Sequence, residues 1–192
     1  MRSTDWNEAV RQRGGTRSCE NRQEGNEPID DAPPEVIGFT NGHRVMKITQ
    51  ALLAEHVVFH NIFDYFERAM PGLRTLGEIR TLASFLESML RVHSLMEDEL
   101  LIEPLEACLC QLAQHENFHE EHEAIEQNLE AIQTARSVAV AKRLLLKAVA
   151  LSRSHFDKEE RIVFPLAEGL LSSQTLLLLG KRWEEERQLL LA

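Results

Sequence analysis

The chain has 192 residues, enough for one domain with a sizeable hydrophobic core. Its formal net charge of −10, with 31 acidic and 21 basic side chains, would repel nucleic acids and anionic lipids, and no basic patch offsets it. Since we find neither a signal peptide nor an apolar span, we expect a cytoplasmic protein that binds neither nucleic acid nor membrane.

Residues 1–40 differ in composition from the rest of the chain. They are rich in Arg, Glu, Asn, Asp, Gly and Pro and show hardly any apolar periodicity. This composition predicts a flexible N-terminal tail, although "TDWNEAVRQR" could form a short helix. Residues 41–192 are poor in Gly and Pro, and their apolar positions recur every three or four residues. That periodicity predicts one all-α domain.

Five helices are expected in this domain. The predicted ranges are 43–70, which ends at Pro71 and Gly72, then 73–104, 114–135 and 140–166, and last a shorter amphipathic helix over 172–192 with a serine cap. Four long helices with short links favour an up-down-up-down antiparallel four-helix bundle, with the short fifth helix closing one end.

One histidine lies on the apolar stripe of each long helix, and the spacing of these four supports the antiparallel arrangement. They are His56, His93, His122 and His155. In an antiparallel hairpin, two residues at the same height are equally far from the turn. The midpoints between successive histidines fall at residues 74–75, near 107 and near 138, and each lies close to a proline or a weak helical region. All four histidines can therefore lie at one level of the bundle.

Two of the helices carry a His-x3-Glu motif. Residues four apart share a helix face, so His93 and Glu97 can both point to the bundle axis, and so can His155 and Glu159. With the other two histidines, these side chains supply nitrogen donors and carboxylates suited to a non-haem di-iron centre. Six protein ligands on two irons leave positions for a bridging oxo or hydroxo group and for an external molecule.

Each motif also has an ordinary interpretation. A His and Glu pair four residues apart stabilises a helix surface by about 0.2–0.5 kcal/mol, so one pair is weak evidence for a metal. Four histidines at one height in a core, however, are costly to bury without a partner. The four together favour a shared metal site.

Four stretches resemble the hemerythrin-like, or HHE cation-binding, domains over about residues 44–170. The stretches are "LLAEHVVFH", "HSLMEDELLIEPL", "EEHEAIEQNLEAI" and "HFDKEERIVFPLAE". The resemblance implies a four-helix bundle that binds two iron ions, with Glu97 and Glu159 bridging them. The implied metal ligands are His56, His93, Glu97, His122, His155 and Glu159.

The chain departs from the oxygen-carrying members of that family, which have a fifth histidine four residues from one of the others. The positions four residues from His122 hold Phe118 and Glu126. The resemblance is therefore to the branch with four histidines and two carboxylates, which includes iron-sensing domains and di-iron proteins that repair iron–sulfur clusters.

These observations predict a protein that binds or senses oxygen, nitric oxide, peroxide or iron at an open coordination position. A dedicated enzyme is less favoured, because no general base or nucleophile stands apart from the cluster. Two alternatives stay open: iron–sulfur cluster repair, and a metal-dependent regulatory or structural module. Repair proteins of this branch often carry an additional N-terminal domain that bears cysteines. Repair is disfavoured here because residues 1–40 contain only one cysteine, Cys19.

Several residues near the cluster have open roles. His60 could hydrogen-bond a ligand, be an extra ligand or lie on a plain helix face, and Glu126 could be a third carboxylate ligand or a solvated side chain. We expect most of Asp98, Glu99 and Glu160 to face water, while some accept a hydrogen bond from a ligand imidazole.

The remaining histidines, the other cysteines and one proline have simpler interpretations. We expect His43, His115 and His119 to be solvent-exposed. Cys108 and Cys110 form a single Cys-x-Cys pair, a poor signature for zinc or redox chemistry, and we interpret them as small apolar side chains. Pro165 is expected to kink or stop the fourth helix.

Overall fold

The computed structural model describes residues 46–105, 109 and 115–189, and the regular elements among them are all helical. The predicted all-α class is confirmed. The predicted tail, His43 and the three cysteines lie outside the described residues, as do the side chains of His115 and His119.

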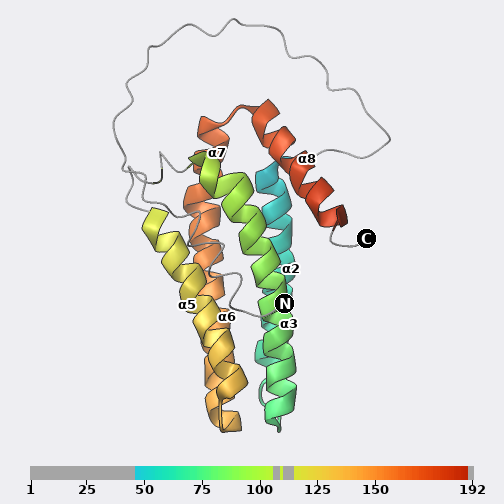
Figure 1. Cartoon of the computed structure of the whole chain (residues 1–192), viewed down its shortest axis with the longest axis vertical. Coiled ribbons are helices and arrows are strands. Elements are labelled where there is room, and N and C mark those ends of the chain that lie inside the picture. Colours follow the sequence, from blue (N-terminus) through green and yellow to red (C-terminus); the bar gives the residue numbers. More distant parts are fainter. Residues whose placement is uncertain (1–45, 106–108, 110–114, 190–192) are drawn as a thin grey trace, which may run out of the picture. The chain divides into compact units, whose positions relative to one another are not determined.

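Four long helices form the antiparallel bundle. They are α2 (Ile48–Ala69), α3 (Leu76–Glu97), α5 (His115–Thr134) and α6 (Val138–Lys158). In Figure 1, α2 and α5 run down the page while α3 and α6 run up it, so the predicted up-down-up-down order is confirmed. The observed helix starts and ends lie within a few residues of the predicted ones.

Side-chain caps fix two of the helix starts close to the predicted turns. The Thr75 hydroxyl accepts a hydrogen bond from the Glu78 backbone N–H at 3.2 Å, and the Glu78 carboxylate accepts one from the Thr75 N–H at 2.8 Å. This reciprocal capping box starts α3 just after Pro71 and Gly72. At the other hairpin, the Ser137 hydroxyl accepts from the Val140 N–H at 3.3 Å and starts α6. Both hairpins therefore turn near the midpoints between their histidines.

The helices that carry the His-x3-Glu motifs contain π-helical turns. These are η1 (Asp98–Ile102), which follows α3, and η2 (Glu159–Val163), which follows α6 and leads into α7 (Phe164–Leu170). In η2 the Phe164 N–H bonds the Glu159 carbonyl five residues back. Such turns are rare and are frequently found at functional sites.

Pro165 does not stop the helix. It lies in the first turn of α7, and the helix continues to Leu170. An interior proline normally leaves a carbonyl without its donor and clashes with the preceding turn. Here the preceding turn is π-helical, with a different hydrogen-bond register, so the sequence rule for a regular α-helix does not apply.

The core consists of two apolar clusters with the histidines between them. On α2, Leu52 belongs to one cluster and Phe59 to the other, and His56 lies between these two residues. On α5, Phe118 and Ile125 flank His122 in the same way. The polar residues are thus enclosed by apolar side chains both above and below them along the bundle.

The predicted fifth helix is α8 (Ser173–Leu189), which packs beside α2 (Figure 1). The Ser172 hydroxyl accepts a hydrogen bond from the Thr175 N–H at 3.1 Å, so the predicted serine cap is confirmed. Gly180 is buried where α8 meets the start of α2, and a Cβ on it would overlap the backbone carbonyl of Met46. Only glycine permits this close approach.

Gly180→Ala is therefore expected to displace α8 and to lower the free energy of unfolding by about 1–3 kcal/mol. Gly169→Ala is the matched control, since nothing lies within 4 Å of a Cβ there. Because alanine has the higher helix propensity, that control should be neutral or stabilised by up to about 1 kcal/mol. Urea denaturation of the two variants measures both effects, and equal stabilities would contradict the close packing at Gly180.

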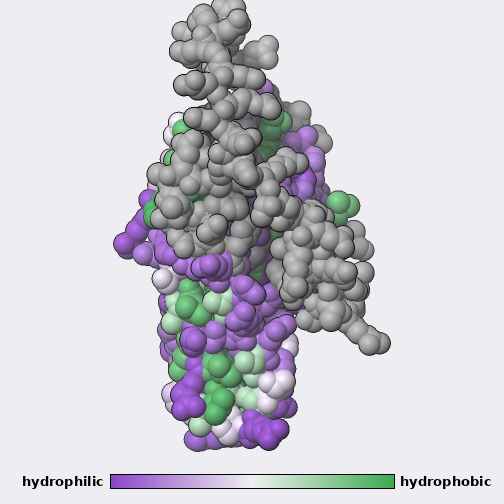
Figure 2. All heavy atoms as spheres, turned by 60° about the vertical axis from the view of Figure 1, so that its left-hand side comes forward, coloured by the Kyte–Doolittle hydropathy of each residue, from purple (hydrophilic) through white to green (hydrophobic). Residues whose placement is uncertain are grey.

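The surface of the described part is mixed in polarity. Figure 2 shows small hydrophobic patches surrounded by hydrophilic residues over the lower part of the bundle. Within the described ranges, no helix combines the length and the apolar character that crossing a bilayer requires.

Candidate metal centre

The six predicted ligands come together from the four long helices and from η2, which contributes Glu159. Two overlapping groups of donors form, and within each group the donor atoms lie within 4.8 Å of one another. One group is His56, His93, Glu97 and Glu159, and the other is Glu97, His122, His155 and Glu159. Both glutamates belong to both groups. This is the arrangement expected of two cation positions that share two carboxylates.

The cluster is enclosed almost completely. His56, His93, Glu97 and Glu159 are fully buried, and His155 is 2% exposed. The His122 side chain is 11% exposed and is the most accessible of the six. Buried charged groups are costly unless they are paired or coordinate a metal.

The carboxylate oxygens of the cluster lack hydrogen-bond donors among the described residues. Both carboxylate oxygens of Glu97 are buried and accept no hydrogen bond within the described part of the chain. The His155 Nε2 and Glu159 Oε1 atoms are 2.6 Å apart, yet they lack the geometry of a hydrogen bond. Both residues belong to the second donor group, as two ligands of one cation would. The residues present therefore fit a metal pair.

The facing imidazoles lead to the same conclusion. The Nε2 atoms of His56 and His93 are 3.2 Å apart. Each of these rings also has a carboxylate at its Nδ1 atom. If the rings are neutral and donate from Nδ1, two lone pairs face each other, which is unfavourable without a proton or cation beside them.

Carboxylates hydrogen-bond three of the four imidazoles at Nδ1, the ring nitrogen that is not among the facing Nε2 donors. Each accepts a hydrogen bond from an Nδ1 atom and so directs the Nε2 lone pair to the centre, the usual arrangement for metal-binding histidines. The pairs are His93 with Glu55 at 2.7 Å, His56 with Glu160 at 3.0 Å and His155 with Glu121 at 3.0 Å. The Nδ1 atom of His122 lies 3.8 Å from Asp98.

Two of these carboxylates were missed by the sequence reasoning. Glu160 and Asp98 were expected as candidates because they neighbour ligands in sequence. Glu55 reaches His93 from a different helix, and Glu121 likewise reaches His155. Spacing within one helix cannot reveal such pairs. The only sequence signal is that each directly precedes a candidate ligand histidine, as Glu55-His56 and Glu121-His122.

The electrostatics of the cluster favour a cation. Burial, then the charge of Glu159, raises the pKa of Glu97 well above its ordinary value. Burial alone would raise the pKa of Glu159 too, but His155 and His56 outweigh it and hold that pKa well below its ordinary value. Burial opposes protonation of His155, yet Glu159 and Glu121 raise the pKa of His155 to about 9. The cluster thus retains protons that an incoming cation would displace.

Phe156 orients the histidines from the side. Its ring stacks on His56 with centroids 3.9 Å apart and an interplanar angle of 9°. It also meets the edge of His93 at 5.3 Å. The aromatic contacts and the Nδ1 hydrogen bonds together leave the two imidazoles little rotational freedom.

His60 and Glu126, whose roles the sequence left open, belong to neither donor group. His60 Nδ1 accepts a hydrogen bond from the Arg153 guanidinium at 3.1 Å, and burial, then Arg153, lowers its pKa. Glu126 is half-buried on α5, where burial and Glu130 raise its pKa. Glu99 pairs with Arg182.

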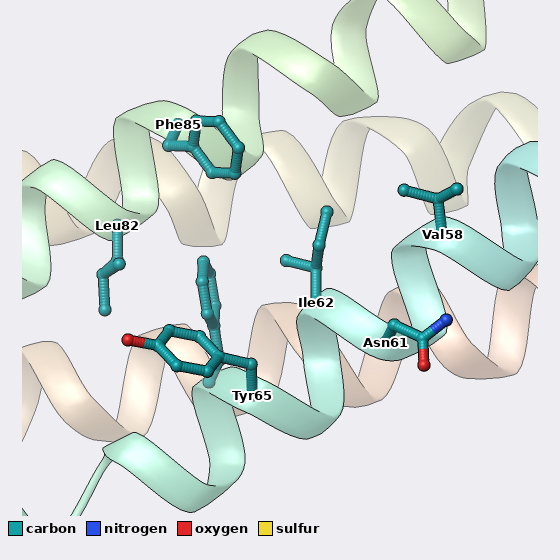
Figure 3. Close-up of a pocket in the computed structure, with 7 residues that line it drawn as sticks. Val58, Asn61, Ile62, Tyr65, Leu82 and Phe85 are labelled. Atoms are coloured by element: carbon teal, nitrogen blue, oxygen red, sulfur yellow. The ribbon is translucent and has the colours of Figure 1, made fainter.

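An apolar groove of about 360 Å³ lies between α2 and α3, away from the cluster. Figure 3 shows the side chains of the two helices facing each other across it. Its lining is Val58, Asn61, Ile62, Tyr65, Phe66, Leu82 and Phe85. Since none of the six candidate ligands lines it, the groove is separate from the metal centre.

The fold and the cluster define a helical-bundle protein built to hold a pair of cations. The model of the hemerythrin HHE cation-binding domain matches residues 47–167, so the chain belongs to this family. The match covers the bundle and ends within α7, which leaves α8 outside it. Neither the curated proteins nor the solved structures that were compared gave a match.

Proposed function

We propose that this cluster holds a non-haem di-iron centre and that the protein binds or senses oxygen, nitric oxide, peroxide or iron. The supporting observation is that Glu97 and Glu159 belong to both donor groups. Two shared carboxylates offset the charge of two cations and hold them close together, and imidazoles complete a ligand set that suits iron.

The residues around the centre would keep it reactive but selective. Bound iron would supply an open coordination position and electron exchange between its ferrous and ferric states. The carboxylates behind the imidazoles hold the donors in place. The apolar clusters on either side exclude bulk water.

Access to the centre favours a small ligand. The six side chains are buried or nearly so, and His122 is the most exposed of them. A diatomic molecule or peroxide would therefore approach past His122. A large organic substrate would have to separate the helices.

Metal analysis after iron-replete expression tests the proposal. We expect about two iron ions per chain and the near-ultraviolet absorption of an oxo- or hydroxo-bridged centre, which should change when oxygen is removed. A protein that holds zinc alone, or no stoichiometric metal, would contradict the proposal.

Two histidine variants test the assignment of the ligands. His93→Ala removes a fully buried donor and should reduce bound iron to one ion per chain or fewer. His60→Ala is the control. His60 lies on α2 one turn from His56, hydrogen-bonds Arg153 and belongs to neither donor group, so this variant should keep both ions. Iron content and the absorption spectrum give the result. Equal iron loss in the two variants would indicate general loosening of the bundle instead.

A further inference from the structure

The C-terminal helix α8 lies outside the residues that match the family, yet one of its arginines reaches the metal cluster through a single carboxylate. Arg187 donates a hydrogen bond to Glu55 Oε1. Glu55 Oε2 accepts the hydrogen bond of His93 Nδ1 at 2.7 Å. Two hydrogen bonds therefore connect α8, α2 and α3 in a continuous line.

This connection is partly shielded from water. The Glu55 side chain is 16% exposed and the Arg187 side chain 25% exposed. The Arg187 guanidinium also lies over the Trp183 ring, 5.6 Å from its centroid. Shielding reduces the screening that makes most surface ion pairs weak.

Glu55 and Glu121 differ in where the basic side chain that pairs with each of them comes from. The Glu121 carboxylate, which holds His155, is paired with Lys158, and both residues lie within the family match. The basic partner of Glu55 is instead Arg187, which lies on α8, beyond the family match. This part of the centre thus depends on how α8 is docked.

We propose that α8 tunes the metal centre through Arg187 and Glu55, which act as positioning residues for His93; this inference rests on the proposed di-iron function. A carboxylate that accepts the Nδ1–H bond makes an imidazole a stronger donor to a metal. The guanidinium on the opposite oxygen withdraws part of that negative charge and fixes the carboxylate. Docking of α8 therefore sets how strongly His93 stabilises the oxidised iron.

Opposite shifts in reduction potential are expected from the two residues. Arg187→Gln leaves the full charge of Glu55 acting on His93, so the potential of the iron-loaded full chain should fall. Glu55→Gln removes that charge, so the potential should rise, and iron affinity should fall about 10- to 100-fold. In the Glu55→Gln background, Arg187→Gln should no longer change the potential.

Arg182→Gln is the control for the docking of α8, since Arg182 ties the same helix to Glu99 and, among the described residues, pairs with no carboxylate that holds a histidine. Its effect on the potential should be the same with and without Glu55→Gln, as for independent sites. Protection of the α8 backbone amides from hydrogen exchange checks that α8 stays docked in every variant.

The outcomes separate this inference from the proposed function. A wild-type chain that binds no iron would overturn the proposed function and the inference with it. A wild-type chain with two irons would overturn the inference alone in two cases: Arg187→Gln leaves the potential unchanged, or it shifts the potential equally in the Glu55→Gln background.

Discussion

Replacing Glu97 by glutamine is expected to remove at least one iron ion from the protein and, at the same time, to stabilise the metal-free protein. Glu97 is fully buried, and its oxygens accept no hydrogen bond from the described residues. Its carboxylate suits a cation but is costly without one. A neutral amide of the same shape removes that cost and can donate to Glu159. Replacing a whole buried ion pair by neutral residues of similar volume is neutral or stabilises proteins by roughly 1–4 kcal/mol, and for this single carboxylate we expect a gain at the lower end of that range.

The gain in stability should depend on pH in a defined direction. Because burial and Glu159 raise the pKa of Glu97 above its ordinary value of 4.5, its protonated form favours folding below 4.5. That contribution is lost as the pH rises through the higher pKa of the folded state. Glutamine cannot lose a proton, so the advantage of Glu97→Gln over the metal-free wild type should grow from pH 4 to pH 7.

Glu126→Gln is the matched control for this experiment. Glu126 is half-buried and its pKa is also raised, but it lies outside both donor groups. Its replacement should leave the iron content unchanged. Urea denaturation of the chelated proteins and iron analysis of the loaded ones measure the two effects. Wild-type iron content in Glu97→Gln would contradict the role assigned to this carboxylate.

Removing iron from the wild-type protein should lower its stability strongly. A ligand that binds only the folded state stabilises it by about 4 kcal/mol when its free concentration is 1,000 times its dissociation constant. For a chain of this size, that corresponds to roughly 8–16 °C in melting temperature. Glu97 lies beside Glu159 in the core, and without a cation the charge of Glu97 opposes folding, because burial and Glu159 raise its pKa.

Differential scanning calorimetry of the loaded and the chelated protein measures this change, and restoring iron should reverse it. Equal melting temperatures would show that the cluster binds no structural cation. A large shift would also favour the regulatory alternative, in which a partner detects the stability of the bundle.

The bundle and the meeting of the six side chains could be predicted because both follow from helical geometry. A residue four positions from another must share its face, and a turn near the midpoint of two histidines must bring them to one height. The structure places His56, His93, His122 and His155 together as that reasoning expects. Their role as iron ligands stays a prediction.

The interactions around the cluster could not be predicted, because they join different helices. Glu55 and Glu121 each hydrogen-bond a histidine of a neighbouring helix. Whether two such residues meet depends on how each helix is rotated about its own axis, which packing determines. The π turns after α3 and α6 have no recognised sequence signal, and without them the continuation of the helix past Pro165 appears forbidden. The contact of Arg187 with Glu55 spans more than a hundred residues.

Anomalous X-ray scattering from crystals of the iron-loaded protein tests the central claim most directly. Data collected just above the iron absorption edge should give two strong anomalous peaks that almost vanish just below it. One peak should lie beside His56 and His93 and the other beside His122 and His155, with Glu97 and Glu159 contacting both. A single peak, or peaks whose height does not change across the iron edge as with another metal, would contradict a di-iron centre.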